Sequence, residues 1–180
     1  MSKSPQGAPS VNLLAVDTAT EGCSAACLTG DKSFERYAVD PQGHSRTLLG
    51  MVEAVLAEAR LERSALDALA YDAGPGSFTG IRIGAGVAQG LALGLEKPLL
   101  AVSSLMTLAE GARREQPDCN SVLAAIDARM DQVYWARLRS DPEAPGHWRW
   151  DEMPCVSEPR EVAVHISGCT GVGSGWDRYS

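Results

Sequence analysis

One stretch constrains the fold of this chain more than any other: DAGPGSFTGIRIG, from Asp72 to Gly84. The residues before it, 66–71, are apolar enough for a buried strand, and those after it, 81–95, form a long apolar run without proline. Glycine reaches positive φ without steric cost and proline fixes φ near the turn value, so the GPG segment predicts a tight loop. The stretch therefore predicts a strand, a loop and a helix, with Ser77 as the helix N-cap.

Five glycines fall inside this predicted helix, and each interior glycine costs roughly 1 kcal/mol relative to alanine. With one alanine they form two rows: Gly80, Gly84 and Ala88 make the first, and Gly86, Gly90 and Gly94 the second. Rows of small residues let another backbone approach closely, so we expect tight packing on two sides, one of them the sheet. The other side has two open interpretations, an internal contact or a contact with another subunit.

The glycine-rich loop does not match the standard nucleotide-binding motifs. GxxxxGK[ST] needs a lysine that does not follow Gly80, and GxGxxG fails because position 79 is threonine. Backbone N–H groups at a helix N-terminus still suit an anion, so an anion site stays an open alternative.

Composition excludes several classes of protein. The hydrophobic content of 44% is ample for a buried core, and the net charge of −7 argues against a chain that grips nucleic acid by itself. No apolar stretch comes near the ~20 residues of a membrane span, and residues 1–10 lack a signal-peptide pattern and predict a disordered tail. We therefore expect a cytoplasmic protein without membrane contact.

The side chains that usually bind metals are scattered. The five cysteines contain no CxxC pair, and His44, His147 and His165 lie far apart, without a second histidine one helical turn away. The sequence predicts neither a metal site nor a disulfide framework.

The rest of the chain predicts alternating strands and helices. The predicted helix at 44–60, with Ser45 as a candidate cap, has one apolar face made by Leu48, Val52, Val55, Leu56 and Ala59. Ser103 or Ser104 is expected to cap a helix that ends near Glu115. The predicted strands are 11–16, 23–28, 33–39, 66–73, 99–102 and 148–153, and a glycine-rich segment follows at 168–175.

The second half of the chain opens with an echo of the first. AVDTATEGCSAACL from Ala15 aligns with AIDARMDQVYWARL from Ala125, which places Asp17 on Asp127 and Leu28 on Leu138. Each segment is an apolar strand, an aspartate, a polar turn and a returning strand. The match suggests two homologous half-domains, each beginning with a hairpin.

Five segments, in order, resemble the TsaB family, also called YeaZ, of bacterial threonylcarbamoyladenosine tRNA modification. They are LLAVDTATEGCSAACL, HSRTLL, DAGPGSFTGIRIG, PLLAVSSL and AAIDARMDQVYWA, and the resemblance covers residues 11–138. It implies an α/β fold, the actin-like ATPase (ribonuclease H-like) fold of two related lobes. We expect a first lobe at 11–105 and a second lobe at 106–180 that is incomplete at its end.

The resemblance also implies a function. TsaB is a partner of TsaD, the subunit that attaches a threonylcarbamoyl group to adenosine 37 of certain tRNAs, with the ATPase TsaE as third member. TsaD carries a metal-binding HxxxH pair, whereas the matching region here offers only His44. We therefore expect a non-catalytic scaffold subunit without cofactor or metal, with ATP and metal on its partners, tRNA contacted only indirectly, and a homodimer when alone.

The same resemblance predicts two sets of site residues. Asp17 and Thr18 occupy the turn that faces the phosphates in active members of the fold, and Gly171 and Gly173 lie where a second phosphate turn is expected. The family pattern there is closer to GDG than to the GVGSG of this chain, so nucleotide binding stays open. The predicted partner interface consists of Leu48, Val52, Gly80, Arg82, Gly84, Gly86 and Gly90.

Two alternatives remain beside the scaffold. An active kinase of this fold needs several carboxylates around magnesium, for which the sequence offers only Asp17 and Asp127, and a metallopeptidase needs metal ligands. A generic anion-binding module would depend on the glycine loops alone.

Overall fold

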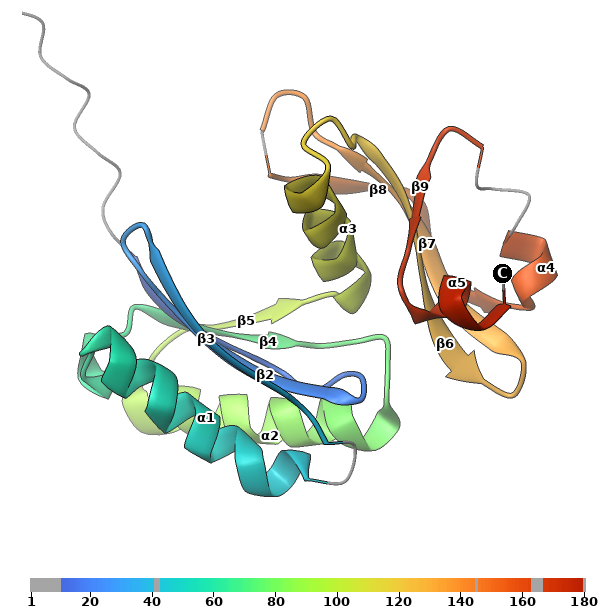
Figure 1. Ribbon diagram of the computed structural model, residues 1–180. Coiled ribbons are helices and arrows are strands. Elements are labelled where there is room, and N and C mark those ends of the chain that lie inside the picture. The colour runs from blue at the N-terminus through green and yellow to red at the C-terminus, as the bar shows by residue number, and fades with distance from the viewer. Residues whose placement is uncertain (1–10, 41–42, 145, 163–166, 180) are drawn as a thin grey trace, which may run out of the picture. The chain divides into compact units, whose positions relative to one another are not determined.

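The computed structural model describes residues 11–40, 43–144, 146–162 and 167–179 (Figure 1). The predicted disordered tail, 1–10, lies outside the described residues. The described residues divide into two compact units: unit 1 comprises those up to Asp72 and from Phe78 to Ala101, and unit 2 comprises Ala73–Ser77 and those from Val102 onward. The predicted lobes, 11–105 and 106–180, remain a prediction about homologous halves.

Unit 1 is built on a five-stranded sheet in the order β3-β2-β1-β4-β5. The first three strands form an antiparallel meander, and β1 also pairs in parallel with β4. Its elements are β1 (Asn12–Asp17), β2 (Gly22–Thr29), β3 (Lys32–Val39), α1 (His44–Ala59), a short 3-10 helix (Arg63–Ala65), β4 (Ala68–Asp72), α2 (Phe78–Leu95) and β5 (Leu99–Val102). The predicted hairpin, helices and strand–loop–helix are confirmed.

Both long helices of unit 1 lie on the same face of this sheet (Figure 1). The apolar stripe predicted for α1 packs there against alternate residues of β1 and β2, such as Leu14, Val16 and Cys27. Alternation puts every second strand residue toward the helices, and a helical period of 3.6 puts one stripe of α1 toward the strands. The fully buried members of that stripe are Leu48, Val52, Val55 and Leu56.

Unit 2 repeats the arrangement with four strands in the order β8-β7-β6-β9. β6, β7 and β8 form an antiparallel meander, and β6 pairs in parallel with β9. The elements are α3 (Ser104–Glu115), β6 (Ser121–Arg129), β7 (Gln132–Ser140), β8 (Trp148–Ser157), α4 (Pro159–Val162), β9 (Thr170–Val172) and α5 (Ser174–Tyr179). One face of the sheet packs on α3, and the other packs on α4 and α5.

The predicted repeat is confirmed as a repeated hairpin that an aspartate closes. Asp17 Oδ1 accepts a hydrogen bond from the Ala19 N–H at 2.8 Å, and Asp127 Oδ1 accepts one from the Arg129 N–H at 2.9 Å. Each aspartate thus bonds the backbone two residues on, which is the usual geometry of an Asx turn.

The register of β7 against β6 differs by one residue from that of β2 against β1. Leu28 pairs with Leu13, whereas Leu138 pairs with Val122, because the pairing of β6 with β7 is irregular after Asp127. A slip of one residue moves a side chain to the opposite face of a sheet. Leu28 is accordingly 40% exposed and Leu138 is 0% exposed, so the predicted equivalence of these two leucines is wrong.

Several local predictions also need correction. The residue before α1 is Gly43, so Ser45 lies inside the helix, and Ser103, which does precede α3, makes no capping hydrogen bond through its side chain. β8 continues to Ser157 instead of ending at Met153, and the short elements β9 and α5 form where only a glycine-rich segment was predicted.

Candidate functional site

The first row of small residues on α2, Gly80, Gly84 and Ala88, packs on the turn that follows β1, and we call it the inner row. The Thr18 hydroxyl donates to the Gly80 carbonyl oxygen at 2.7 Å, and a Cβ added to Gly84 would lie 2.6 Å from Thr18 Oγ1. Both glycines are buried, together with Ala88 and Ala92 of the same side. The predicted packing of one row against the sheet is therefore confirmed, and the close approach explains why glycine is needed at position 84.

The second row, Gly86, Gly90 and Gly94, which we call the outer row, packs on none of the residues that the structure describes. A Cβ added to Gly86, Gly90 or Gly94 would meet no heavy atom within 4 Å. Helix propensity alone makes each of these residues about 1 kcal/mol worse than alanine. No contact with the part of the chain that the structure describes explains these three glycines.

Large apolar side chains are exposed on both helices. Phe78 is 71% exposed and Leu93 is 82% exposed on α2, and Leu49 is 48% exposed on α1. The Arg82 guanidinium lies 3.3 Å from the centroid of the Phe78 ring and donates to the Phe78 carbonyl oxygen at 3.0 Å.

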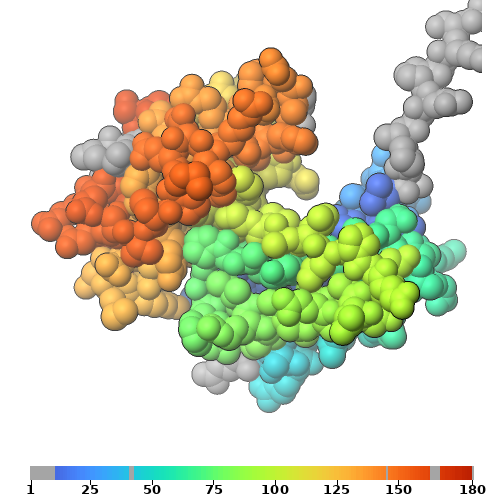
Figure 2. Space-filling model, turned by 180° about the vertical axis from the view of Figure 1, so that it is seen from behind, coloured from blue at the N-terminus to red at the C-terminus, as the bar shows by residue number. Residues whose placement is uncertain are grey.

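We name this surface the outer helix face and define it by Leu49, Gly50, Phe78, Arg82, Gly86, Gly90, Leu93 and Gly94. Figure 2 shows the side of unit 1 on which α2, in green to yellow-green, lies at the surface. Exposed apolar side chains next to open backbone are typical of protein interaction sites.

The structure divides the predicted interface residues into two groups. Arg82, Gly86 and Gly90 lie at the surface. The other four are buried, so their assignment to an interface is corrected: Leu48, Val52, Gly80 and Gly84. Leu48 and Val52 belong to the buried stripe of α1. The residues of α1 that sequence reasoning missed are Leu49, beside that stripe, and Gly50, on the opposite side of the helix; the helical period could have identified both.

The Asp17–Thr18 turn is bonded within unit 1. The Thr18 side chain is 1% exposed and its hydroxyl is used by Gly80, as described above. Burial raises the pKa of Asp17, against the opposing effects of the Ala19 N–H and of His44. The Asp17 carboxyl is therefore desolvated, and the Thr18 hydroxyl already donates a hydrogen bond.

The second glycine-rich turn packs closely on β6 of unit 2. Gly173 has φ +101°, and a Cβ there would lie 2.3 Å from the Ala125 carbonyl oxygen. The Ser174 hydroxyl accepts from the Asp127 N–H at 3.2 Å, and Gly171 pairs with Leu123 in the sheet. Conformation and close approach are sufficient reasons for glycine at position 173.

Asp127, the counterpart of Asp17, is surrounded by donors. Besides the Arg129 N–H, it accepts from the Tyr179 hydroxyl at 3.2 Å and from the Arg178 guanidinium at 2.8 Å. Burial acts to raise the pKa of Asp127, but these donors and the charges of Arg178 and Arg129 outweigh it and lower the pKa.

Among the described residues, no group of three or more His, Cys, Asp or Glu side chains is placed to hold a metal ion. His44 is 4% exposed, and its Nε2 lies 3.3 Å from the Glu21 carbonyl oxygen. His165 lies outside the described part of the chain.

By length and composition alone, α2 is apolar enough to cross a membrane, with 18 residues and a mean hydropathy of 1.2. This corrects the expectation that no stretch comes near that length. Since α2 buries its inner row in the core of unit 1, one such helix is weak grounds for a membrane span.

Comparisons with known proteins connect this geometry to a family. The tRNA threonylcarbamoyladenosine biosynthesis protein TsaB of Escherichia coli (strain K12) is 43% identical over an alignment of 173 positions, which covers 94% of this chain and 74% of that protein. The chain belongs to the TsaB family. The TsaB of Haemophilus influenzae is 38% identical over 94% of this chain and 75% of its own length. By these names, the family acts in tRNA threonylcarbamoyladenosine biosynthesis.

Solved structures of this family have the same fold. YeaZ from Pseudomonas aeruginosa matches with a TM-score of 0.84 and 45% identity, over 93% of this chain and 78% of that chain. A second structure, described as an uncharacterized protein with similarity to peptidase YEAZ from Pseudomonas aeruginosa, has a TM-score of 0.84 and 44% identity, over 93% of this chain and 77% of that chain. With two related sheets, the chain has the mixed α/β, actin-like fold that the resemblance implied.

A second family also matches: the one described as TsaD, tRNA N6-adenosine threonylcarbamoyltransferase, over residues 39–144. This range includes both helices of the outer helix face. The TsaB and TsaD families thus share sequence in the region that forms this surface.

Proposed function

We propose that this chain is a non-catalytic partner subunit in the synthesis of threonylcarbamoyladenosine at position 37 of tRNA, and that it binds a TsaD subunit through the outer helix face. The observation that carries the proposal is the outer row of α2, where an added Cβ at each of three glycines would meet no heavy atom of the described residues within 4 Å. Close contact with a second backbone would offset the helix propensity that they lose.

The proposed contact is symmetric in its architecture. Helices α1 and α2 of one subunit would meet the corresponding helices of the other, which makes a four-helix contact about a two-fold axis. The match of the TsaD family to residues 39–144 supports this, because related surfaces can form a pseudo-symmetric heterodimer. The same surface would form a homodimer when the chain is alone.

Phe78 and Arg82 are the proposed anchors of this contact. An aromatic ring with a stacked guanidinium is enriched at the centre of protein interfaces, and Leu93 and Leu49 add exposed apolar area. The stack holds both side chains before binding, so less rotamer freedom would be lost on association.

The other partners follow from charge and from the family. With a net charge of −7 we expect weak tRNA binding by the lone subunit, so tRNA would be contacted indirectly, through TsaD. TsaE would be the third member, and ATP and metal would reside on the partner subunits. We propose a cytoplasmic location, where tRNA is modified.

The main alternative is an active enzyme of the same fold. One related structure is described as similar to a peptidase, which is consistent with that alternative. The bonds of Thr18 and Asp127 within the chain favour the scaffold, since both side chains are already used. Stoichiometric zinc or iron in elemental analysis of the purified chain, or ATP or peptide turnover that disappears with Asp17→Ala, would support the enzyme instead.

Leucine substitutions along α2 test the interface. We expect Gly86→Leu and Gly90→Leu to weaken homodimerisation and TsaD binding by about tenfold or more, with an unchanged circular dichroism spectrum. Gly84→Leu should unfold unit 1, because its side chain would overlap Thr18. Size-exclusion chromatography with light scattering, alone and with TsaD, measures both forms of association.

Gly111→Leu is the matched control. Gly111 lies in α3, is exposed, and has no heavy atom within 4 Å of an added Cβ, so the change in side chain is the same on another helix. If Gly86→Leu and Gly90→Leu associate as well as Gly111→Leu does, the outer helix face is not the interface.

A further inference from the structure

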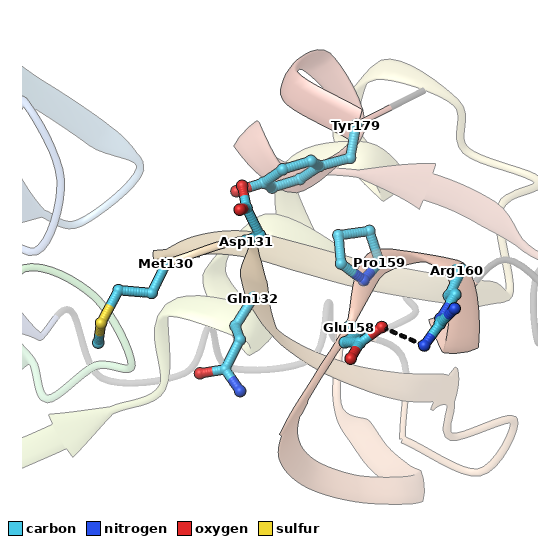
Figure 3. A pocket seen from close by; sticks show the side chains of 7 residues that line it. All are labelled: Met130, Asp131, Gln132, Glu158, Pro159, Arg160 and Tyr179. Carbon is cyan, nitrogen blue, oxygen red and sulfur yellow. Dashed lines mark ion pairs between the residues drawn. The ribbon is translucent and has the colours of Figure 1, made fainter.

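A hollow of about 530 Å³ opens in unit 2 between the β6–β7 turn, the start of α4 and the end of α5 (Figure 3). Its lining comes from turn residues 130–132, from residues 158–160 and from Tyr179. This volume lies in the range of sites that bind small molecules or inserted side chains. The hollow belongs to neither the outer helix face nor the Asp17 turn.

The β6–β7 turn holds three successive residues in the left-handed region: Arg129, Met130 and Asp131 have φ values of 67°, 50° and 56°. Two-residue turns of this kind normally carry asparagine and glycine, which adopt that conformation readily. Here a methionine stands at the tip with its side chain 87% exposed. Met130 therefore gains little from packing within the chain, and its flexible thioether is available to another molecule.

The lining carries two carboxylates, Asp131 and Glu158, and one guanidinium, Arg160, which leaves a net charge of −1. Among the described residues, the Asp131 carboxylate has no ion pair, while both neighbouring guanidinium groups, of Arg129 and Arg178, bind Asp127 instead. Glu158 pairs with Arg160 at 2.7 Å.

That pair is weak because its side chains are 53% and 80% exposed, so water screens the attraction between the charges. Its Glu158 carboxylate can change partners at little cost. The Glu161 carboxylate of α4, which accepts from the Glu158 N–H at 3.3 Å, adds one more negative charge beside the lining, so the lining favours a cation.

Tyr179 supplies an aromatic surface beside the unpaired carboxylate. Its hydroxyl donates to Asp127 at 3.2 Å, which fixes the ring, and Figure 3 shows Asp131 directed toward it. The Arg178 guanidinium carbon lies 5.5 Å from the centroid of the same ring. A ring next to a carboxylate suits a guanidinium group, which is planar, stacks on aromatic faces and bonds carboxylates through two N–H groups.

We propose that this hollow binds an arginine side chain from a basic segment of a partner protein. The guanidinium would bond Asp131 and stack on Tyr179, and Met130 would contact an apolar residue next to that arginine. The site is independent of the proposed TsaD contact, which lies on unit 1.

The test uses the full chain, ¹³C-labelled at the methionine methyl groups, and the peptide Ac-Leu-Arg-Leu-NH₂ as probe. Its control is Ac-Leu-Cit-Leu-NH₂, in which citrulline has the shape of arginine without the charge. We expect saturable NMR shifts of the Met130 methyl and the Gln132 amide with the arginine peptide, and binding about tenfold weaker with citrulline.

Two charge-removing variants locate the site. Asp131→Asn should weaken binding of the arginine peptide about five- to tenfold. Asp31→Asn, the same change in the exposed β2–β3 turn of unit 1, should leave that binding unchanged. Equal binding of the two peptides, equal effects of the two variants, or no saturable shift at about 10 mM peptide would overturn the proposal. A Met130 shift that depends on protein concentration alone and disappears with Asp131→Asn would also overturn it, because the occupant would then be a second copy of this chain.

Discussion

Asp17 in unit 1 and Asp127 in unit 2 close equivalent hairpins with the same backbone bond, but their surroundings shift the pKa of the two carboxyl groups in opposite directions. Asp17 is desolvated by burial, which raises its pKa, with only the Ala19 N–H and His44 acting the other way. Around Asp127, burial is outweighed by donors from Arg129, Arg178 and Tyr179, so its pKa is lowered. The repeat therefore preserves the turn that the aspartate closes, while the electrostatics of the two turns differ.

The two units also use glycine for different reasons. In unit 2, Gly173 is required by its φ of +101° and by the carbonyl of Ala125. In unit 1, Gly84 is required by Thr18, but a Cβ at Gly86 or Gly90, on the opposite side of the same helix, would meet none of the described atoms within 4 Å. Only the glycines of the outer row need a contact from another molecule to explain them, so the proposed interface is based on them.

The largest expected difference concerns the two leucines that sequence alignment equates. Leu138→Ala should lower the free energy of unfolding by about 3 kcal/mol, because it leaves a cavity beneath α3. Leu28→Ala should cost less than about 1 kcal/mol, because Leu28 is 40% exposed. Urea denaturation measures both values, and equal losses would contradict the one-residue slip between the hairpins.

The second contrast compares a constrained glycine with an unconstrained one. Gly173→Ala should destabilise the chain by about 2 kcal/mol or more, since the new Cβ meets a backbone oxygen and φ is positive. Gly90→Ala, on the outer row of α2, should instead stabilise the isolated chain by up to about 1 kcal/mol. Thermal unfolding of the two variants gives shifts of opposite sign; two losses would mean that the outer row has contacts within the chain.

A smaller difference is expected between the aspartates. Asp127→Asn should cost about 1–2 kcal/mol, because charge-assisted bonds to Arg178 and Tyr179 are weakened. Asp17→Asn should change stability by less than about 0.5 kcal/mol at neutral pH, since the amide oxygen can still accept from Ala19 and no charge is buried. Chemical denaturation at neutral pH measures both, and a greater loss at Asp17 would reverse our account of the two turns.

The smallest effect is the pH dependence of these two variants. The lowered pKa of Asp127 contributes stability that is complete above the unfolded value of 3.8 and is lost as pH falls through the folded pKa. The raised pKa of Asp17 contributes stability that is complete below 3.8 and is lost as pH rises through the folded pKa.

The stability difference between the parent chain and Asp127→Asn should therefore increase as pH rises toward 3.8, and the difference for Asp17→Asn should decrease above 3.8. Denaturation midpoints between about pH 3 and pH 7 test both slopes. Parallel profiles for the two variants would mean that the two carboxyl groups share one environment.

Much of this protein could be predicted from the sequence because the relevant signals are local. Alternation of apolar residues specifies the hairpins, the helical period specifies the buried stripe of α1, and GPG between apolar runs specifies the turn into α2. The five segments from LLAVDT to AAIDARMD identify the family, and the glycine spacing identified two rows on α2 before their surroundings were known.

What only the tertiary structure decided depends on contacts between distant residues. Sequence spacing could not say which row of α2 meets Thr18, and it assigned the buried Leu48 and Val52 to a surface. Nor could it show the change of register after Asp127, where the pairing of β6 with β7 is irregular. This change puts Leu138 of β7 on the opposite face of its sheet from its counterpart Leu28 in β2. Asp127 and Tyr179 are 52 residues apart in the chain, so the environment of that carboxyl exists only once α5 has folded onto β6.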